Sequence, residues 1–218
     1  MENSHLTHMY LLHSKSDMLQ AYKTFEAWAE TQLDAKIKCL HSDHGGEFTG
    51  AAFVKHLNLK GTVQKLTIHD TPKQNGVAEV LNHIAMEHTR AILHTGGLPK
   101  FLWGEALHHV IWLKIRTSTT VVPSVMPLEA VTKKKPNLSA LPEWGCEVWV
   151  HTLKNSKLDV HATCACWISF DKQSKGSRIY WPKHCLITVE MSITFTPAVV
   201  IDDLEGEDDS TENLGKVN

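Results

Sequence analysis

Two carboxylates are the first residues in this sequence whose types and spacing could do chemistry together. Asp43 lies in the stretch SDHGGEF and Glu79 in the stretch QNGVAE, with 35 residues between them. Paired carboxylates can hold divalent cations, and two Mg²⁺ ions about 3.5–4 Å apart support phosphoryl transfer. An isolated pair of acids is more often a solvated surface charge. The interpretation therefore depends on the elements that hold these acids and on the residues around them.

Three short stretches of the first half are expected to be strands. Residues 36–43, KIKCLHSD, alternate in side-chain character as a strand does, and this strand ends at Asp43 before a Gly-Gly turn. Residues 62–70, TVQKLTIHD, predict a second strand, and residues 7–14, THMYLLHS, predict a short one near the start. The strand at 36–43 would present the Asp43 carboxylate at its C-terminal end.

Helical periods occupy the spaces between the predicted strands. Apolar residues recur at helical spacing after Ser16, which is the expected N-cap. Gly61 closes a short helix, and Gly96-Gly97 closes the long helix that carries Glu79. The four helical segments are residues 16–32, 49–61, 74–97 and 99–118. The alternation of strands and helices predicts an α/β layer for the first half of the chain.

The second half of the chain predicts a different architecture. Residues 119–143 contain four prolines and a lysine run, which mark a linker. Short strand-like runs then follow at the close spacing that is typical of a small β-barrel. These runs are residues 146–152, 162–170, 177–182, 184–190 and 191–196. From Asp202 the chain holds seven acidic residues against Lys216 alone, and this acidic end predicts disorder.

Composition narrows the class of protein. The formal net charge is −2, which argues against a strongly basic, nonspecific nucleic-acid binder, although the chain before its acidic end is mildly cationic. We find no apolar run of about eighteen residues and no secretory signal, which predicts an intracellular protein of the nucleus or cytoplasm with no membrane partner. The five cysteines lack CxxC spacing and predict reduced thiols. Structural zinc at His5 and His8 is not expected, because no cysteine pair accompanies them.

The side chains of the predicted barrel leave one alternative open. Its tryptophans alternate with other apolar residues at strand spacing, which favours positions in the barrel core or at its rim. A base-stacking surface for single-stranded nucleic acid is the alternative. These residues are Trp144, Trp149, Trp167 and Trp181. Cys164 and Cys166 also alternate along a strand, so both are expected on one side of it as small core residues.

Four motifs together resemble the integrases of copia-type LTR retrotransposons. The motifs are LHSDHGGEF, TPKQNGVAEVLN, GGLPKFLWGEAL and KKPNLSALPEWGCEVWV, in the order and at the spacing of that family, and the resemblance covers roughly residues 3–196. It implies an incomplete ribonuclease H-like integrase core, then a small SH3-like β-barrel and a disordered acidic tail. The implied segments are a core at 1–118, a linker at 119–143, a barrel at 144–197 and a tail at 198–218.

The resemblance also implies which residues act. The family joins element ends to target DNA by polynucleotidyl transfer, and its Asp-Asp-35-Glu triad holds Mg²⁺ or Mn²⁺. Asp43 matches the second acid of the triad and Glu79 matches its glutamate. Gly45 and Gly46 match the turn beside the metal region. The mobile loop that contacts nucleic acid is matched by Lys73, Gln74, Asn75 and Gly76. DNA is the implied partner, with RNA and a second copy of the chain as further candidates.

Several positions depart from the family pattern, and these departures predict an inactive protein. The first aspartate of the triad would fall before Met1, so this chain offers two carboxylates of three. His44 stands where the family has asparagine. Val80, Leu81 and His83 stand where it has basic residues, whose phosphate contacts supply much of the affinity for DNA. We therefore expect a weakly bound or absent metal ion and an incomplete, marginally stable α/β part.

Two alternatives remain at this point. The chain could be a captured fragment that works as a noncatalytic nucleic-acid or protein interaction module, with the barrel as its working part. The product could also begin upstream of Met1 and include the first aspartate. We predict an integrase-derived, nucleic-acid-binding protein of the α/β class that is inactive as this chain.

Overall fold

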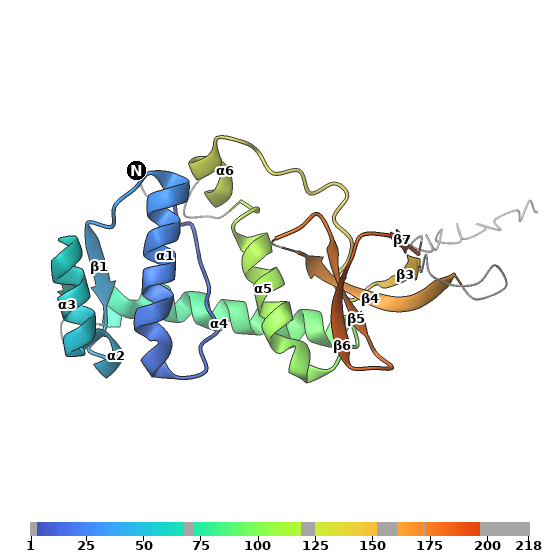
Figure 1. The fold of residues 1–218 in the computed structure, drawn as a ribbon, viewed down its shortest axis with the longest axis horizontal. Coiled ribbons are helices and arrows are strands. Elements are labelled where there is room, and N and C mark those ends of the chain that lie inside the picture. Colours follow the sequence, from blue (N-terminus) through green and yellow to red (C-terminus); the bar gives the residue numbers. More distant parts are fainter. Residues whose placement is uncertain (1–3, 68–71, 119–124, 152–160, 172, 197–218) are drawn as a thin grey trace, which may run out of the picture.

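The protein contains two separate β-sheets joined by helices, as a computed structural model shows (Figure 1). The structure describes residues 4–67, 72–118, 125–151, 161–171 and 173–196. One sheet has two parallel strands, and the other has five strands in the order β6-β5-β4-β3-β7. Helix α4 runs from the small sheet toward the large one (Figure 1). The predicted mixed α/β class is therefore confirmed, with an antiparallel sheet in the second half.

The small sheet pairs the two strands predicted around Asp43. Strand β1 (Cys39–Ser42) lies parallel to β2 (Val63–Leu66), with Cys39 opposite Val63 and Ser42 opposite Leu66. The sheet has two strands, so within the described residues β1 has no strand at its other edge.

Two helices cover one side of the small sheet. Helix α1 (Met18–Leu33) and helix α3 (Ala51–Lys60) pack together, and a short helix α2 (Gly46–Thr49) precedes α3. Gly61 ends α3 with φ +72°, a left-handed conformation that glycine adopts at low cost, so the predicted stop is confirmed. The buried cluster here is small, and its fully buried members are Tyr22, Phe53 and Leu57.

The start of α1 differs from the prediction. A 3-10 turn, η1 (Lys15–Asp17), precedes the helix, and Asp17 rather than Ser16 is the N-cap. The Asp17 carboxylate reaches back across this turn and accepts the Ser14 backbone N–H at 3.0 Å. Asp17 thus stabilises the turn before α1, where Ser16 was expected to cap the helix.

Residues 7–14 do not form the predicted strand and have no regular secondary structure. The His8 ring lies 4.0 Å from the Trp28 ring on α1, measured between centroids. Met9 packs against the buried residues of α4 and α5. The prediction was wrong because the apolar side chains of this segment serve contacts with helices, and no strand among the described residues pairs with it.

Helices α4 (Pro72–Thr95) and α5 (Trp103–Lys114) form the central pair, with a 3-10 turn η2 (Lys100–Leu102) leading into α5. Their buried contact is made by Ala85, Leu107, Val110 and Ile111. The Gly96-Gly97 pair ends α4 as predicted. A Cβ atom at Gly96 would lie 3.2 Å from the Trp144 ring and from the Trp144 carbonyl oxygen, so this glycine also allows the large sheet to approach.

The predicted linker contains a helix. Helix α6 (Pro127–Thr132) begins with proline at its first turn, where the missing N–H costs nothing. The Leu128 N–H donates to the Ile115 carbonyl at 2.8 Å, which ties α6 to the end of α5. Residues 127–132 are thus ordered against the preceding helix. The boundaries of a linker at 119–143 stay a prediction.

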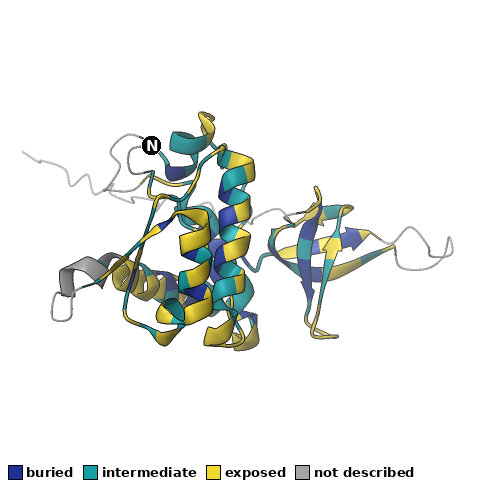
Figure 2. Ribbon diagram, turned by 60° about the vertical axis from the view of Figure 1, so that its left-hand side comes forward, coloured by how far each residue is buried: buried dark blue, intermediate teal, exposed yellow. Residues whose placement is uncertain are grey.

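All five strands predicted in the second half are present. They are β3 (Glu147–His151), β4 (Ala162–Phe170), β5 (Ser177–Trp181), β6 (Leu186–Glu190) and β7 (Ile193–Phe195). Every pairing in this sheet is antiparallel. Figure 2 shows buried residues on the strands of this sheet, and buried and exposed positions alternate along β3, whereas β4 and β5 bury consecutive residues. Its buried cluster contains Val148, Val150, Ala165, Trp167 and Ile179. Closure into an SH3-like barrel stays a prediction.

The large sheet is anchored to the helices by a second cluster and an ion pair. Its buried members are Leu102, Ala106, Trp144, Ile168 and Tyr180, which come from η2, α5 and the sheet. Arg178 of β5 donates through Nε to the Glu105 carboxylate of α5 at 3.1 Å and through Nη2 at 2.5 Å. The two halves of the sequence therefore share one core in space. Among the described residues, none of the helices is long and apolar enough to span a bilayer.

Candidate functional site

Asp43 follows directly after β1, as predicted, and its side chain is half-buried. Its Oδ1 accepts the Gly45 backbone N–H at 3.0 Å, which closes an Asx turn. One carboxylate oxygen is thus held against the backbone of the Gly-Gly turn. The strand positions the residue and the turn orients its carboxylate.

Gly45 brings a second carboxylate to Asp43. A Cβ atom at Gly45 would lie 3.0 Å from Asp43 Oδ1 and 2.9 Å from Glu47 Oε2, so both oxygens crowd the same small space. Glu47 also lies beside Lys15, with 3.7 Å between Oε1 and Nζ. Sequence reasoning missed Glu47. The signal was its place in the same SDHGGEF motif, because a tight turn folds position i+4 back onto position i.

His44 ties the same turn to the small sheet. Its Nε2 lies 2.7 Å from the Thr67 carbonyl oxygen at the end of β2. A carbonyl oxygen only accepts, so Nε2 carries the proton in this hydrogen bond. The imidazole at the position where the family has asparagine therefore links the residues after β1 to the strand beside it.

Glu79 lies in the third turn of α4 and is exposed. Apolar and polar side chains are mixed on this part of the helix: Val80 is 57% exposed, and Asn82, His83 and Ile84 are also exposed. Within the described residues, no group of three or more His, Cys, Asp or Glu side chains could hold a metal ion. The predicted convergence of Asp43 and Glu79 on a cation stays a prediction.

The residues matched to the mobile nucleic-acid loop lie within helix α4, which begins at Pro72. The helix predicted from residue 74 therefore begins two residues earlier, and a proline at the first position suits a helix start. The side chains of Lys73, Gln74 and Asn75 lie outside what the structure describes. Gly76 is half-buried, with open space where a Cβ would stand. Their contact with nucleic acid stays a prediction.

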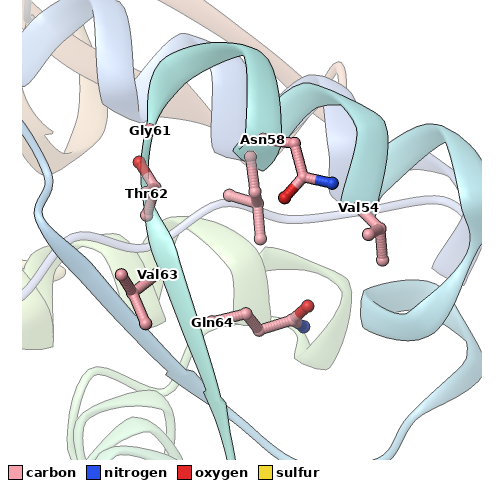
Figure 3. Close-up of a pocket in the computed structure, with 7 residues that line it drawn as sticks. Val54, Asn58, Gly61, Thr62, Val63 and Gln64 are labelled. Carbon is pink, nitrogen blue, oxygen red and sulfur yellow. The ribbon is translucent and has the colours of Figure 1, made fainter.

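A pocket of about 450 Å³ lies between α3 and β2 (Figure 3). Its lining residues are Val54, Leu57, Asn58, Gly61, Thr62, Val63 and Gln64. Two of its polar groups are already engaged: Thr62 Oγ1 donates to the Ile37 carbonyl at 2.8 Å, and Gln64 Nε2 donates to the Phe48 carbonyl at 3.0 Å. The pocket includes neither Asp43 nor Glu79, so it is separate from the predicted acid site.

The four tryptophans of the second half have different environments. Trp144 and Trp167 are buried, as expected for core residues, and Trp181 Nε1 donates to Thr188 Oγ1 at 2.8 Å. Trp149 alone among the four is exposed, with 43% of its surface open to solvent. The core prediction for Cys164 was wrong, because it lies on the open face of β4. Partial desolvation at the sheet surface and then the nearby Glu147 raise the pKa of the exposed Cys164 thiol, which keeps it protonated.

Relatives in sequence are transposon polyproteins. The chain is 31% identical over 194 residues to a retrovirus-related Pol polyprotein from transposon TNT 1-94 of Nicotiana tabacum, which covers 88% of the chain and 15% of the relative. It is 26% identical over 188 residues to the Pol polyprotein from transposon RE1 of Arabidopsis thaliana, over 82% of the chain and 13% of the relative. The chain thus spans a small part of these relatives. No protein-family model matches it.

Two solved structures show distant likeness. The catalytic core domain of BIV integrase aligns with a TM-score of 0.43 and 18% identity, over 60% of this chain and 80% of that one. A simian T-cell lymphotropic virus intasome in complex with PP2A regulatory subunit B56 gamma aligns with a TM-score of 0.45 and 12% identity. That alignment covers 84% of this chain and 65% of the other.

Proposed function

This chain is related to the integrase-like region of copia-type retrotransposon Pol polyproteins, and on that premise we propose that it binds nucleic acid but does not cleave or join DNA as this polypeptide. The similarity over 88% of the chain is the observation that carries the proposal. DNA is the proposed partner, with RNA second, and self-association is proposed as in an oligomeric integrase. The nucleus and the cytoplasm are the proposed sites of action.

The surroundings of Glu79 support the proposed loss of DNA cleavage at this helix. A DNA-cleaving helix would need cations beside the glutamate to contact phosphates, because each neutralised phosphate contributes to affinity. Here the exposed positions next to Glu79 carry Val80 and, one turn later, His83 and Ile84. This surface cannot attract a phosphate backbone as the family's basic residues would.

The carboxylates fit Mg²⁺ or Mn²⁺ in donor type, since both ions take oxygen ligands. Asp43 and Glu79 would hold such an ion by family resemblance, and when bound it would polarise a phosphoryl group. The described residues place Glu47, rather than a third triad acid, beside Asp43. Because Asp43 Oδ1 already accepts the Gly45 N–H, we propose weak metal binding by this chain.

A noncatalytic protein-interaction module is the second candidate. The observation that favours it is a group of exposed apolar side chains at the β6 edge of the large sheet. Its members are Leu186, Val189 and Met191. Apolar side chains at a sheet edge are typical of contact with a partner protein.

A nicking and binding experiment tests the proposal. The full chain is incubated with a labelled element-end duplex in Mg²⁺ and in Mn²⁺, beside the Asp43→Asn variant. We expect no nicking by either protein. Nicking by the unmodified chain that Asp43→Asn abolishes would overturn the proposed inactivity. Affinity for the same duplex is expected to fall as salt rises, and affinity that ignores salt would overturn phosphate-led binding.

A further inference from the structure

Trp149 lies in the interior of the large sheet yet remains open to solvent. It occupies the middle of β3, which is paired on one side with β4 and on the other with β7. Its cross-strand partners are Cys164 and Thr194. Both side chains are small, so neither can cover an indole. The ring therefore lies on a flat, open face and not between large neighbours.

The strand alternation leaves no core position for this indole. Val148 and Val150, on either side of Trp149 in sequence, are buried on the opposite face of β3. Successive side chains of a strand point to opposite faces, so Trp149 must point outward. Both neighbouring strands hold the backbone, which fixes the side of the sheet from which the ring projects.

The polar groups around Trp149 are partly cationic. His151, two residues along the same face, lies 2.9 Å from Thr194 Oγ1 through its Nε2. Lys183 is exposed in the turn between β5 and β6, just past the end of β5, which pairs with β4 at Cys166, two residues from Cys164. Burial and Glu147 raise the pKa of the Cys164 thiol, while the Lys183 ammonium opposes the shift. An ammonium near the Trp149 ring can neutralise one phosphate, although Glu147 on the same face opposes it.

We propose that Trp149 is a stacking platform for one base of single-stranded nucleic acid, with Lys183 beside the adjoining phosphate. This rests on the proposed nucleic-acid binding and adds where and in what form the strand binds. A flat, exposed ring suits the face of an unstacked base, which a duplex hides inside its stack. A peptide usually binds in a groove. The side chains of Cys164 and Thr194 are too small to form a groove beside Trp149.

Fluorescence anisotropy with labelled oligothymidine and oligouridine of about twelve nucleotides tests the platform, since single-strand sites span about 4–16 nucleotides. Trp149→Ala is expected to weaken binding to the single strand about tenfold, the value of one stacked base. Trp149→Phe should keep most of the affinity, whereas Trp149→Leu should lose it, because leucine has no aromatic face. The two oligonucleotides show whether DNA or RNA is preferred.

A matched control is Trp103→Ala, because Trp103 at the start of α5 has 46% exposure and is not on the sheet. This variant should bind like the unmodified chain. A duplex of the same length should bind equally to the chain and to Trp149→Ala. Lys183→Gln should lower the slope of log affinity against log salt by about 0.7 for the single strand.

The outcomes separate the platform from the wider proposal. Single-strand binding that Trp149→Ala and Trp149→Leu leave unchanged would overturn the platform while nucleic-acid binding stands. Failure to bind either single strand or duplex would overturn both. Equal loss with phenylalanine, leucine and alanine at position 149 would show that stacking is not the contact and would also overturn it. Far-ultraviolet circular dichroism checks that each variant is folded.

Discussion

The two sheets of this protein differ in how completely their residues are buried. The parallel pair β1–β2 leaves one face open, where Val63 is 58% exposed, although parallel sheets are normally covered on both faces. The five-stranded sheet buries Val148, Trp167 and Ile179 completely and shares a further cluster with α5. The first half, which contains Asp43 and Glu79, is thus the less self-supporting one, and the second half is the better packed.

The packing of α1 on α3 beside the small sheet includes polar contacts of the buried Glu26 as well as apolar contacts. Glu26 of α1 is 3% exposed, and its Oε2 lies 2.8 Å from His56 Nε2 and 3.5 Å from Lys60 Nζ on α3. The Tyr22 hydroxyl beside them is buried without a hydrogen-bond partner in the described structure. A region held in this way should respond strongly to the loss of a single polar partner.

A substitution at Trp167, in the five-stranded sheet, is expected to lower the free energy of unfolding most. Trp167 is fully buried and its ring packs edge-on to His109, Phe170 and Phe195. Trp167→Ala should lower the free energy of unfolding by about 3–5 kcal/mol, because a large cavity replaces the indole. Urea unfolding measures it. Trp149→Ala, on the open face of the same sheet, should change it little, and an equal loss in the two variants would contradict this account.

Acid is expected to lower the free energy of unfolding by a smaller amount, through His109 of α5, which packs against Trp167 of the large sheet. Burial lowers the pKa of His109 to about 4, from an ordinary value of 6.5. As the pH falls from about 6.5 to 4, the unfolded chain takes up a proton that the folded chain excludes, so the free energy of unfolding falls, by roughly 3 kcal/mol at most. Urea unfolding across this range measures the fall.

His109→Phe is the matched variant for the acid effect, because it keeps an aromatic ring against Trp112 and Trp167 but cannot titrate. Its unfolding free energy should fall less than that of the unmodified chain over the same pH range. Parallel pH profiles for the two proteins would show that His109 is already charged in the folded state.

A substitution at His56, beside the small sheet, is expected to lower the free energy of unfolding least. His56→Ala removes the closest partner of the buried Glu26 carboxylate and should cost about 1–3 kcal/mol. Amide hydrogen exchange should quicken in β1 and β2 and stay unchanged in β3 to β5. Lys60→Ala, at the solvent side of the same carboxylate, is the control and should have a smaller effect. Equal acceleration in both sheets would mean that the halves unfold together.

Local patterns account for much of the fold. The five short runs after Gly145 are strand-like in composition and lie at close spacing, and each is a strand in the structure. Gly61 and the Gly96-Gly97 pair end helices because a left-handed residue is needed there. Residues 7–14 show the limit of such patterns, since Met9 and its neighbours pack on helices that a linear pattern does not reveal.

The candidate site was predictable only in part. The position of Asp43 at a strand end follows from the alternation of residues 36–43, but its neighbour Glu47 depends on how tightly the Gly45 turn closes. The Asp17 cap of α1 depends similarly on a turn before the helix. Short local rules identify elements, whereas side-chain convergence depends on the turn geometry between them.

The sequence alone indicated the four helical segments of the first half, the five strands of the second half, the family of the chain and the alternation that places a strand residue such as Trp149 on one of the two faces of its sheet. Only the tertiary structure decided which of those faces is covered. Helix α5 contributes Ala106 to the cluster that buries Tyr180 and Ile168, so that part of the sheet is core, while Trp149, opposite Cys164 and Thr194, stays 43% exposed. Periodicity sets the direction of a side chain, but burial depends on a distant partner, which local sequence does not encode.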